Sequence, residues 1–88
     1  MSNIIFDITV VQDLKDWSKN EPKLVKKFFD LLADIHKTPF EGLGKPEALK
    51  HQYKGLWSRR ITDEHRLIYQ VLSNGDISII SVHGHYEM

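Results

Sequence analysis

The sequence predicts a single α+β domain in which two N-terminal helices pack on one face of a mostly antiparallel sheet. One short β-like run, two stretches of helical periodicity and three further β-like runs follow one another, giving the order βααβββ. The Asn-Gly pair in "SNGD" separates the last two runs and is typical of a hairpin turn. A length of 88 residues suits one domain, so residues 1–88 are assigned to it.

The composition excludes several classes of protein. Hydrophobic residues make up 41% and charged residues 27% of the chain, which is typical of a globular domain. Because no apolar run could span a bilayer and no secretory signal is recognised, we expect a cytoplasmic protein without a membrane partner. The lack of cysteine excludes disulfides, zinc thiolates and thiol nucleophiles.

The N-terminal half is predicted to form one strand and two helices. Residues 4–8 alternate and predict a strand with Ile4, Phe6 and Ile8 on one face. Thr9 and Gln12 fit a capping box, and the first helix then has an apolar stripe of Val10, Val11, Leu14 and Trp17. The second helix follows Pro22 and has an apolar stripe of Leu24, Val25, Phe28, Leu31, Leu32 and Ile35. Its expected solvent side comprises Lys23, Lys26, Lys27, Asp30 and Asp34.

Residues 38–50 contain two prolines and two glycines, so we expect a long loop. Pro46 suits the first turn of a helix. A helical turn there would place Glu47, Lys50 and His51 on one face.

Three strands are predicted at residues 55–61, 66–72 and 77–85. A two-residue turn at Asn74 and Gly75 would pair Arg66 with His83. One face would then pack under the helices through Leu67, Tyr69, Val71, Ile80 and Val82. The opposite face would carry Arg66, Ile68, Gln70, Ile79, Ser81, His83 and His85. In the preceding strand, apolarity assigns Trp57 and Ile61 to the core, Arg60 to the polar face and Arg59 to the border of the core, with its head extending to solvent.

The polar face would combine arginines with a carboxylate and an imidazole. All three arginines lie within residues 59–66, surrounded by several lysines and histidines, although the net charge of the chain is zero. Arginine contacts two phosphate oxygens at once. RNA cleavage by a 2′-hydroxyl without a metal needs one group to accept a proton and another to donate one. Glu47 and His85 could supply these groups, with Tyr86 stacking on a base.

Two other readings stay open from the residues alone. His83 and His85 share a face at spacing i, i+2 and could bind a metal. The whole face could also be a simple anion-binding surface without catalysis. We expect no cofactor.

The stretch "TPFEGLGKPEALKHQYKGLWSRRITDEHRLIYQV" and the terminal "HY" resemble the YoeB/Txe family of the RelE/ParE toxin-antitoxin superfamily. The resemblance covers nearly the whole chain in order. It implies a RelE-like microbial RNase fold with a twisted sheet, and a metal-independent endoribonuclease that cleaves mRNA in the ribosomal A site. It implies the catalytic residues Glu47 as general base, Arg66 as phosphate ligand and His85 as general acid. The expected substrate-binding residues are Lys50, Arg60, Tyr86, His51 and Arg59.

The resemblance also implies partners. These are a YefM-like antitoxin whose disordered segment folds over the catalytic face, the 70S ribosome with its mRNA, and a second copy of the chain in a homodimer. An alternative within the same superfamily is a toxin that binds another target, such as DNA gyrase, without catalysis. The combination of Glu47 and His85 favours the nuclease, because a binding protein needs neither proton carrier.

Overall fold

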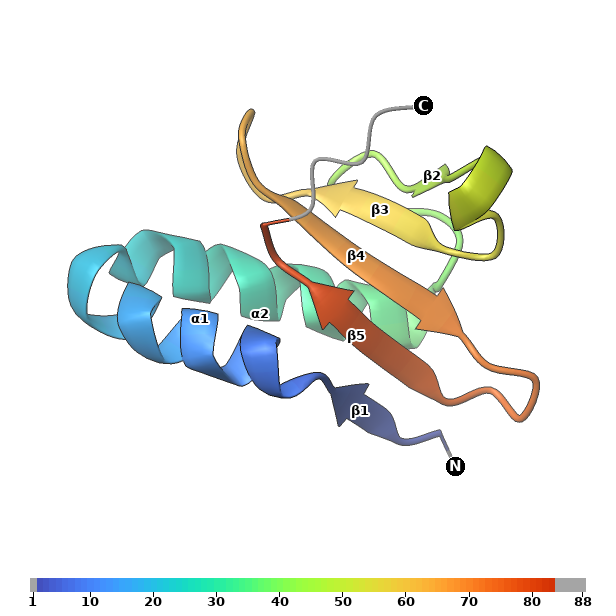
Figure 1. Ribbon diagram of the computed structural model, residues 1–88, viewed down its shortest axis with the longest axis horizontal. Helices are drawn as coiled ribbons and strands as arrows, with labels where there is room; N and C mark the ends of the chain where they lie inside the picture. The colour runs from blue at the N-terminus through green and yellow to red at the C-terminus, as the bar shows by residue number, and fades with distance from the viewer. Residues whose placement is uncertain (1, 84–88) are drawn as a thin grey trace.

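A five-stranded mixed sheet, with two helices packed on one face, makes up the computed structural model, which describes residues 2–83 (Figure 1). The elements follow the chain as β1 (Ile4–Phe6), α1 (Ile8–Asn20), α2 (Pro22–Lys37), β2 (Glu47–Ala48), the 3₁₀ turn η1 (His51–Tyr53), β3 (Trp57–Arg60), β4 (Arg66–Val71) and β5 (Ile77–Ser81). The strand order is β1-β5-β4-β3-β2. Among the strands of the described residues, only β1 with β5 is a parallel pair, so the predicted α+β class with a mostly antiparallel sheet is confirmed.

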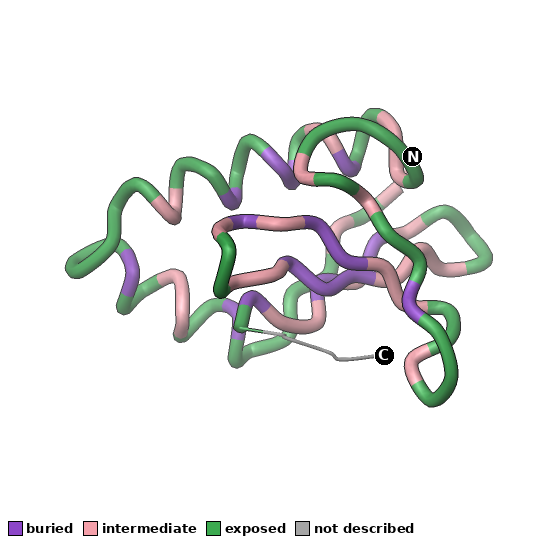
Figure 2. Tube along the Cα trace, turned by 90° about the horizontal axis from the view of Figure 1, so that it is seen from above, coloured by how far each residue is buried: buried purple, intermediate pink, exposed green. Residues whose placement is uncertain are grey.

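The core lies between the helices and one face of the sheet (Figure 2). All six residues of the predicted α2 stripe are in the core or packed against it. The α1 stripe is confirmed for Val10, Leu14 and Trp17, whereas Val11 is exposed. Neither helix of residues 2–83 is long and apolar enough to cross a membrane.

Helix α1 begins earlier than predicted. Asp7, not Thr9, caps the helix, because its carboxylate accepts hydrogen bonds from both the backbone N–H and the hydroxyl of Thr9. These hydrogen bonds lower the pKa of the Asp7 carboxyl, with the bond from the Thr9 hydroxyl as the main cause. Ile8 therefore belongs to the helix and is 66% exposed, instead of extending the first strand.

The segment after Pro46 is a strand and not the predicted helical turn. Glu47 and Ala48 pair with Ser58 and Trp57 and form β2 at the sheet edge. An isolated helical turn is costly to nucleate, whereas the free edge of β3 offers backbone hydrogen bonds at once. Glu47, Lys50 and His51 consequently do not share a helix face.

Near its turn, the β4–β5 hairpin has a register that differs from the predicted one. The Leu72 N–H donates to Asp76 O at 2.7 Å and Gly75 has a φ of 91°, as in a three-residue loop that ends in a left-handed residue. Tyr69 therefore pairs with Ile79 and Val71 with Ile77. Ile79 lies in the core and Ile80 does not, which reverses the prediction for these two residues. An irregularity between Ile68 and Tyr69 then restores the predicted pair Ile68 with Ser81.

Candidate active site

Strand register places three predicted site residues on the sheet face that points away from the helices. Glu47 is opposite Ser58, Ser58 is opposite Ile68, and Arg60 is opposite Arg66. Directly paired residues and residues two apart along a strand share a face. Because Tyr69 and Leu67 of β4 face the helices, Glu47, Arg60 and Arg66 face away from them.

The spacing on this face suits a phosphodiester. Paired Cα atoms of Arg60 and Arg66 lie about 5 Å apart. Glu47 lies two strands across and two residues along from Arg66, which separates their Cα atoms by about 12 Å. Glu47 is exposed and the two arginines are half-buried. A carboxylate and two guanidinium groups can therefore contact one nucleotide from opposite sides.

The guanidinium of Arg60 is only weakly engaged by the fold. Its Nη1 lies 3.9 Å from Asp63 Oδ1, and the Arg60 side chain is 40% exposed. Its Nε is buried and has no hydrogen-bond partner within residues 2–83. An unpaired buried donor typically costs about 1–3 kcal/mol, which an incoming phosphate oxygen next to this side chain could offset.

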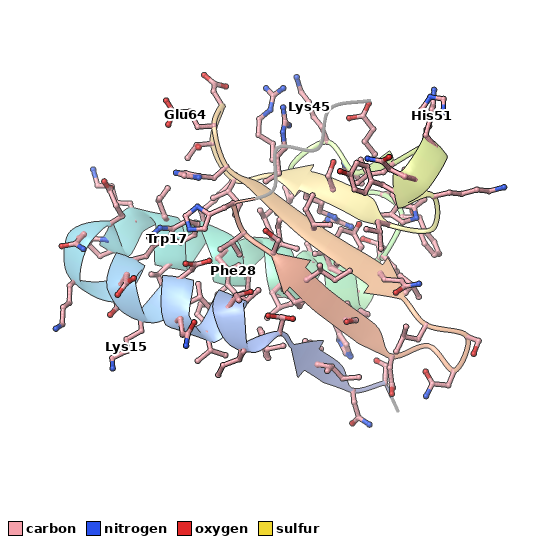
Figure 3. All side chains as sticks on the ribbon, viewed as in Figure 1. Lys15, Trp17, Phe28, Lys45, His51 and Glu64 are labelled. Atoms are coloured by element: carbon pink, nitrogen blue, oxygen red, sulfur yellow. The ribbon has the colours of Figure 1, made fainter. Side chains whose placement is uncertain are left out.

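Further cations lie at the edge of the same region. Lys50 and His51 are exposed at the start of η1, and Lys45 is exposed two residues before Glu47. Lys45 and His51 stand on the side of the sheet away from the helices (Figure 3). Gly44 O accepts a hydrogen bond of 2.7 Å from the backbone N–H of Arg60, which ties the Lys45 segment to β3.

Arg59 does not extend to solvent as predicted, and it cannot contact a substrate from its position. Its side chain is fully buried on the helix side of β3. The guanidinium donates to Asp34 Oδ2, Tyr69 Oη and the carbonyl oxygens of Thr38, Glu41 and Leu43. Every donor direction is thus used by α2, by the loop that follows it or by Tyr69 of β4. Arg59 anchors this loop instead of forming part of the site.

Asp34 completes this anchor and is not the solvent-facing residue that helix periodicity predicted. It accepts hydrogen bonds from the Leu43 N–H and from Arg59, and these, in that order, lower the pKa of its carboxyl. Tyr69 contributes from β4, donating to Pro39 O at 2.7 Å, and burial raises the pKa of its hydroxyl. Gly42 has a φ of 116° and a Cβ there would lie 2.1 Å from Asp34 Oδ2, so only glycine fits beside the carboxylate.

His83 does not lie opposite Arg66 on the polar face, because β5 ends at Ser81 and the chain bends. Its ring turns to α1, where Nε2 lies 3.1 Å from Asp13 Oδ1 and the ring packs edge-on against Trp17. Sequence reasoning missed Asp13 and Trp17 as neighbours of His83. His85 and Tyr86 lie outside the described residues. Within residues 2–83, no three His, Asp or Glu side chains are grouped to hold a metal ion.

The comparisons with known proteins agree on one family. The model of "YoeB-like toxin of bacterial type II toxin-antitoxin system" matches residues 6–86. Toxin YoeB of Escherichia coli K12 is 49% identical over 70 residues, covering 80% of this chain and 82% of that protein. Two solved structures from Staphylococcus aureus are also similar. The YoeB dimer has a TM-score of 0.86 at 42% identity, covering 97% of this chain and 98% of that one.

The second similar structure from Staphylococcus aureus is a heterotetrameric YoeB-YefM toxin-antitoxin complex, whose matching chain has a TM-score of 0.84 at 44% identity. It covers 98% of this chain and 99% of that one. These likenesses confirm the YoeB resemblance and the RelE-like fold. The protein belongs to the family of YoeB-like toxins of bacterial type II toxin-antitoxin systems.

Proposed function

We propose that this toxin is a metal-independent endoribonuclease that cleaves mRNA in the A site of the 70S ribosome and so blocks translation. The observation that carries the proposal is the shared face of Glu47, Arg60 and Arg66, which combines an exposed carboxylate with two half-buried arginines on one side of the sheet. A surface that only bound an anion would gain nothing from a carboxylate, because the carboxylate repels phosphate.

The chemistry follows from these groups and from His85 of the tail. Glu47 accepts the proton of the ribose 2′-hydroxyl, whose oxygen forms a bond to the adjacent phosphorus. The bond from phosphorus to the 5′-oxygen breaks, and His85 donates a proton to that oxygen, which leaves a 2′,3′-cyclic phosphate. Arg66 and Arg60 stabilise the extra negative charge on the phosphorane. Each positioned acid or base typically contributes about 10²- to 10⁴-fold.

The remaining substrate contacts are assigned to cations and to the tail. Lys50 and His51 border the face from η1 and can bind neighbouring phosphates. Tyr86 is proposed to stack on a base. Because the net charge of the chain is zero, binding rests on this local basic cluster and should weaken steeply with salt.

The partners are proposed from the relatives. A YoeB of Staphylococcus aureus forms a complex with YefM and another structure of it is a dimer. We therefore infer a YefM-like antitoxin that covers the catalytic face, and a homodimer of the free toxin. Because ribosomes are in the cytoplasm, we expect the toxin to be located there.

A cleavage assay tests the proposal. Purified protein, either untreated or stripped of bound metal with a chelator that is then removed, is mixed with programmed 70S ribosomes, and cut sites are mapped. We expect cleavage within the A-site codon that survives chelation and falls at least about 100-fold in Glu47→Ala and His85→Ala. The wild type and both variants are also expressed in cells. If all three arrest growth while the mRNA stays intact, the nuclease proposal is overturned, and a binding toxin with another target, such as DNA gyrase, is favoured. Activity lost to the chelator would instead favour a metal hydrolase.

A further inference from the structure

A cluster of four side chains joins α1 to the point where β5 ends. His83 lies with Nε2 at 3.1 Å from Asp13 Oδ1 of α1. Trp17, one helical turn further along α1, contacts the rings of both His83 and His65, with centroid distances of 5.6 and 5.3 Å. The two imidazole rings are themselves 5.4 Å apart. The proposed reaction uses none of these four residues.

Burial shows that this cluster is built into the domain. Trp17 is 7% exposed and belongs to the main core, so it offers a fixed wall for the two rings. The Asp13 side chain is 27% exposed and that of His83 is 52% exposed. The contact between Asp13 and His83 therefore lies next to the buried Trp17, but it adds little buried surface of its own.

The cluster lies beside two residues of the proposed site, Arg66 and His85, in the chain. His65 is followed directly by Arg66, so the contact between His65 and His83 holds the end of β5 beside the first residue of β4. His85 follows His83 by two residues. Two residues of extended chain span at most about 7 Å between Cα atoms, so the location of His83 limits where His85 can reach.

We propose that Asp13 and Trp17 are positioning residues, which hold His83 beside His65 and thereby keep the imidazole of His85 within reach of the phosphate bound by Arg66. This inference rests on the proposed function. It assigns to α1, which contributes no residue to the catalytic face, a part in the protonation of the leaving 5′-oxygen. A misplacement of about 1 Å at a reacting group can cost about 100-fold in rate.

Two substitutions at position 13 and one matched control test this role. Asp13→Ala removes the carboxylate beside His83 Nε2, whereas Asp13→Asn keeps a side-chain oxygen at the same place. Asp16→Ala removes an exposed aspartate of the same helix that has no hydrogen-bond or ion-pair partner within residues 2–83, and it serves as the control. We expect Asp13→Ala to lower kcat in the ribosome assay about 10- to 100-fold, with KM within about twofold. Asp13→Asn should recover most of this loss, and Asp16→Ala should match the wild type.

A second measurement follows the cluster without any substrate. The Cε1 proton of His83 is shifted by the ring current of Trp17, and its NMR resonance should move in Asp13→Ala but not in Asp16→Ala. A wild-type kcat in Asp13→Ala would overturn the positioning role while leaving the nuclease intact. A lowered melting temperature without a change in kcat would likewise leave only a structural role. An inactive wild-type protein would overturn the proposed function and this role together, and an unmoved His83 resonance would overturn the anchor itself.

Discussion

Arg59 and Arg60 are neighbours in β3, yet they serve the molecule in opposite ways. Arg59 points to the helices, is fully buried and donates to five oxygen acceptors. Arg60 points to the other face, with a side chain that is 40% exposed and one distant ion pair to Asp63. Successive side chains of a strand point to opposite faces. The same chemical group is thus structural on one side of the sheet and available to a ligand on the other.

The largest expected difference is in stability. Arg59→Met keeps much of the side-chain volume but removes the charged partner of Asp34 and one hydrogen bond from each of three carbonyl oxygens, so we expect a loss of about 3–5 kcal/mol in the free energy of unfolding. Urea denaturation measures it. Arg60→Met is the matched control on the opposite face and should lose less than about 1 kcal/mol. Equal losses in the two variants would show that the faces do not differ as described.

Arg66→Ala extends the comparison to activity. Arg66 pairs with Arg60 on the face away from the helices, and removing a preorganised group that stabilises developing charge typically costs about 10²- to 10³-fold in rate. We expect this loss in the ribosome cleavage assay, with an unfolding midpoint close to that of the wild type. A protein that melts many degrees lower would identify Arg66 as a second structural arginine.

The smallest expected effect is a pH dependence of stability from the Asp34 end of the anchor. The pKa of Asp34 is lowered in the folded state, so the unfolded chain binds its proton first as the pH falls. The stabilisation is therefore complete above the ordinary value of 3.8 and is lost as the pH falls through the lower folded pKa. Urea midpoints from pH 6 down to pH 2 should fall less steeply in Asp34→Asn than in the wild type. Parallel curves would contradict the anchor, since Asp7, whose pKa is also lowered, remains in both proteins.

Local patterns in the sequence predicted the helices and the central strands well. The six residues of the predicted α2 stripe recur with helical period, and every one of them packs in or against the core. The strand pattern of β3 and β4 also predicted which face carries Arg60 and Arg66, because the side-chain period of two leaves little choice once Tyr69 is buried and Trp57 packs against the core. These features depend only on residues close together in the chain.

Features that depend on distant partners could not be predicted in the same way. Helix periodicity placed Asp34 toward solvent, but Arg59 reaches it across 25 residues of sequence. The segment of Glu47 became a strand because β3 offers it an edge, and β4–β5 changed register because three residues, not two, form the turn. The His83 side chain contacts Asp13 and Trp17 of α1 instead of lying opposite Arg66 on the sheet.

The sequence by itself determined the α+β class, the apolar faces of the elements and the chemical groups available for a nuclease. Those properties follow from side-chain periodicity and residue type. The tertiary structure decided which arginine is buried, how Glu47 reaches the face of Arg66, and where the end of β5 is held. Each of these depends on hydrogen bonds or ring contacts between residues far apart in the chain, whose free energy becomes available only when the whole domain has folded.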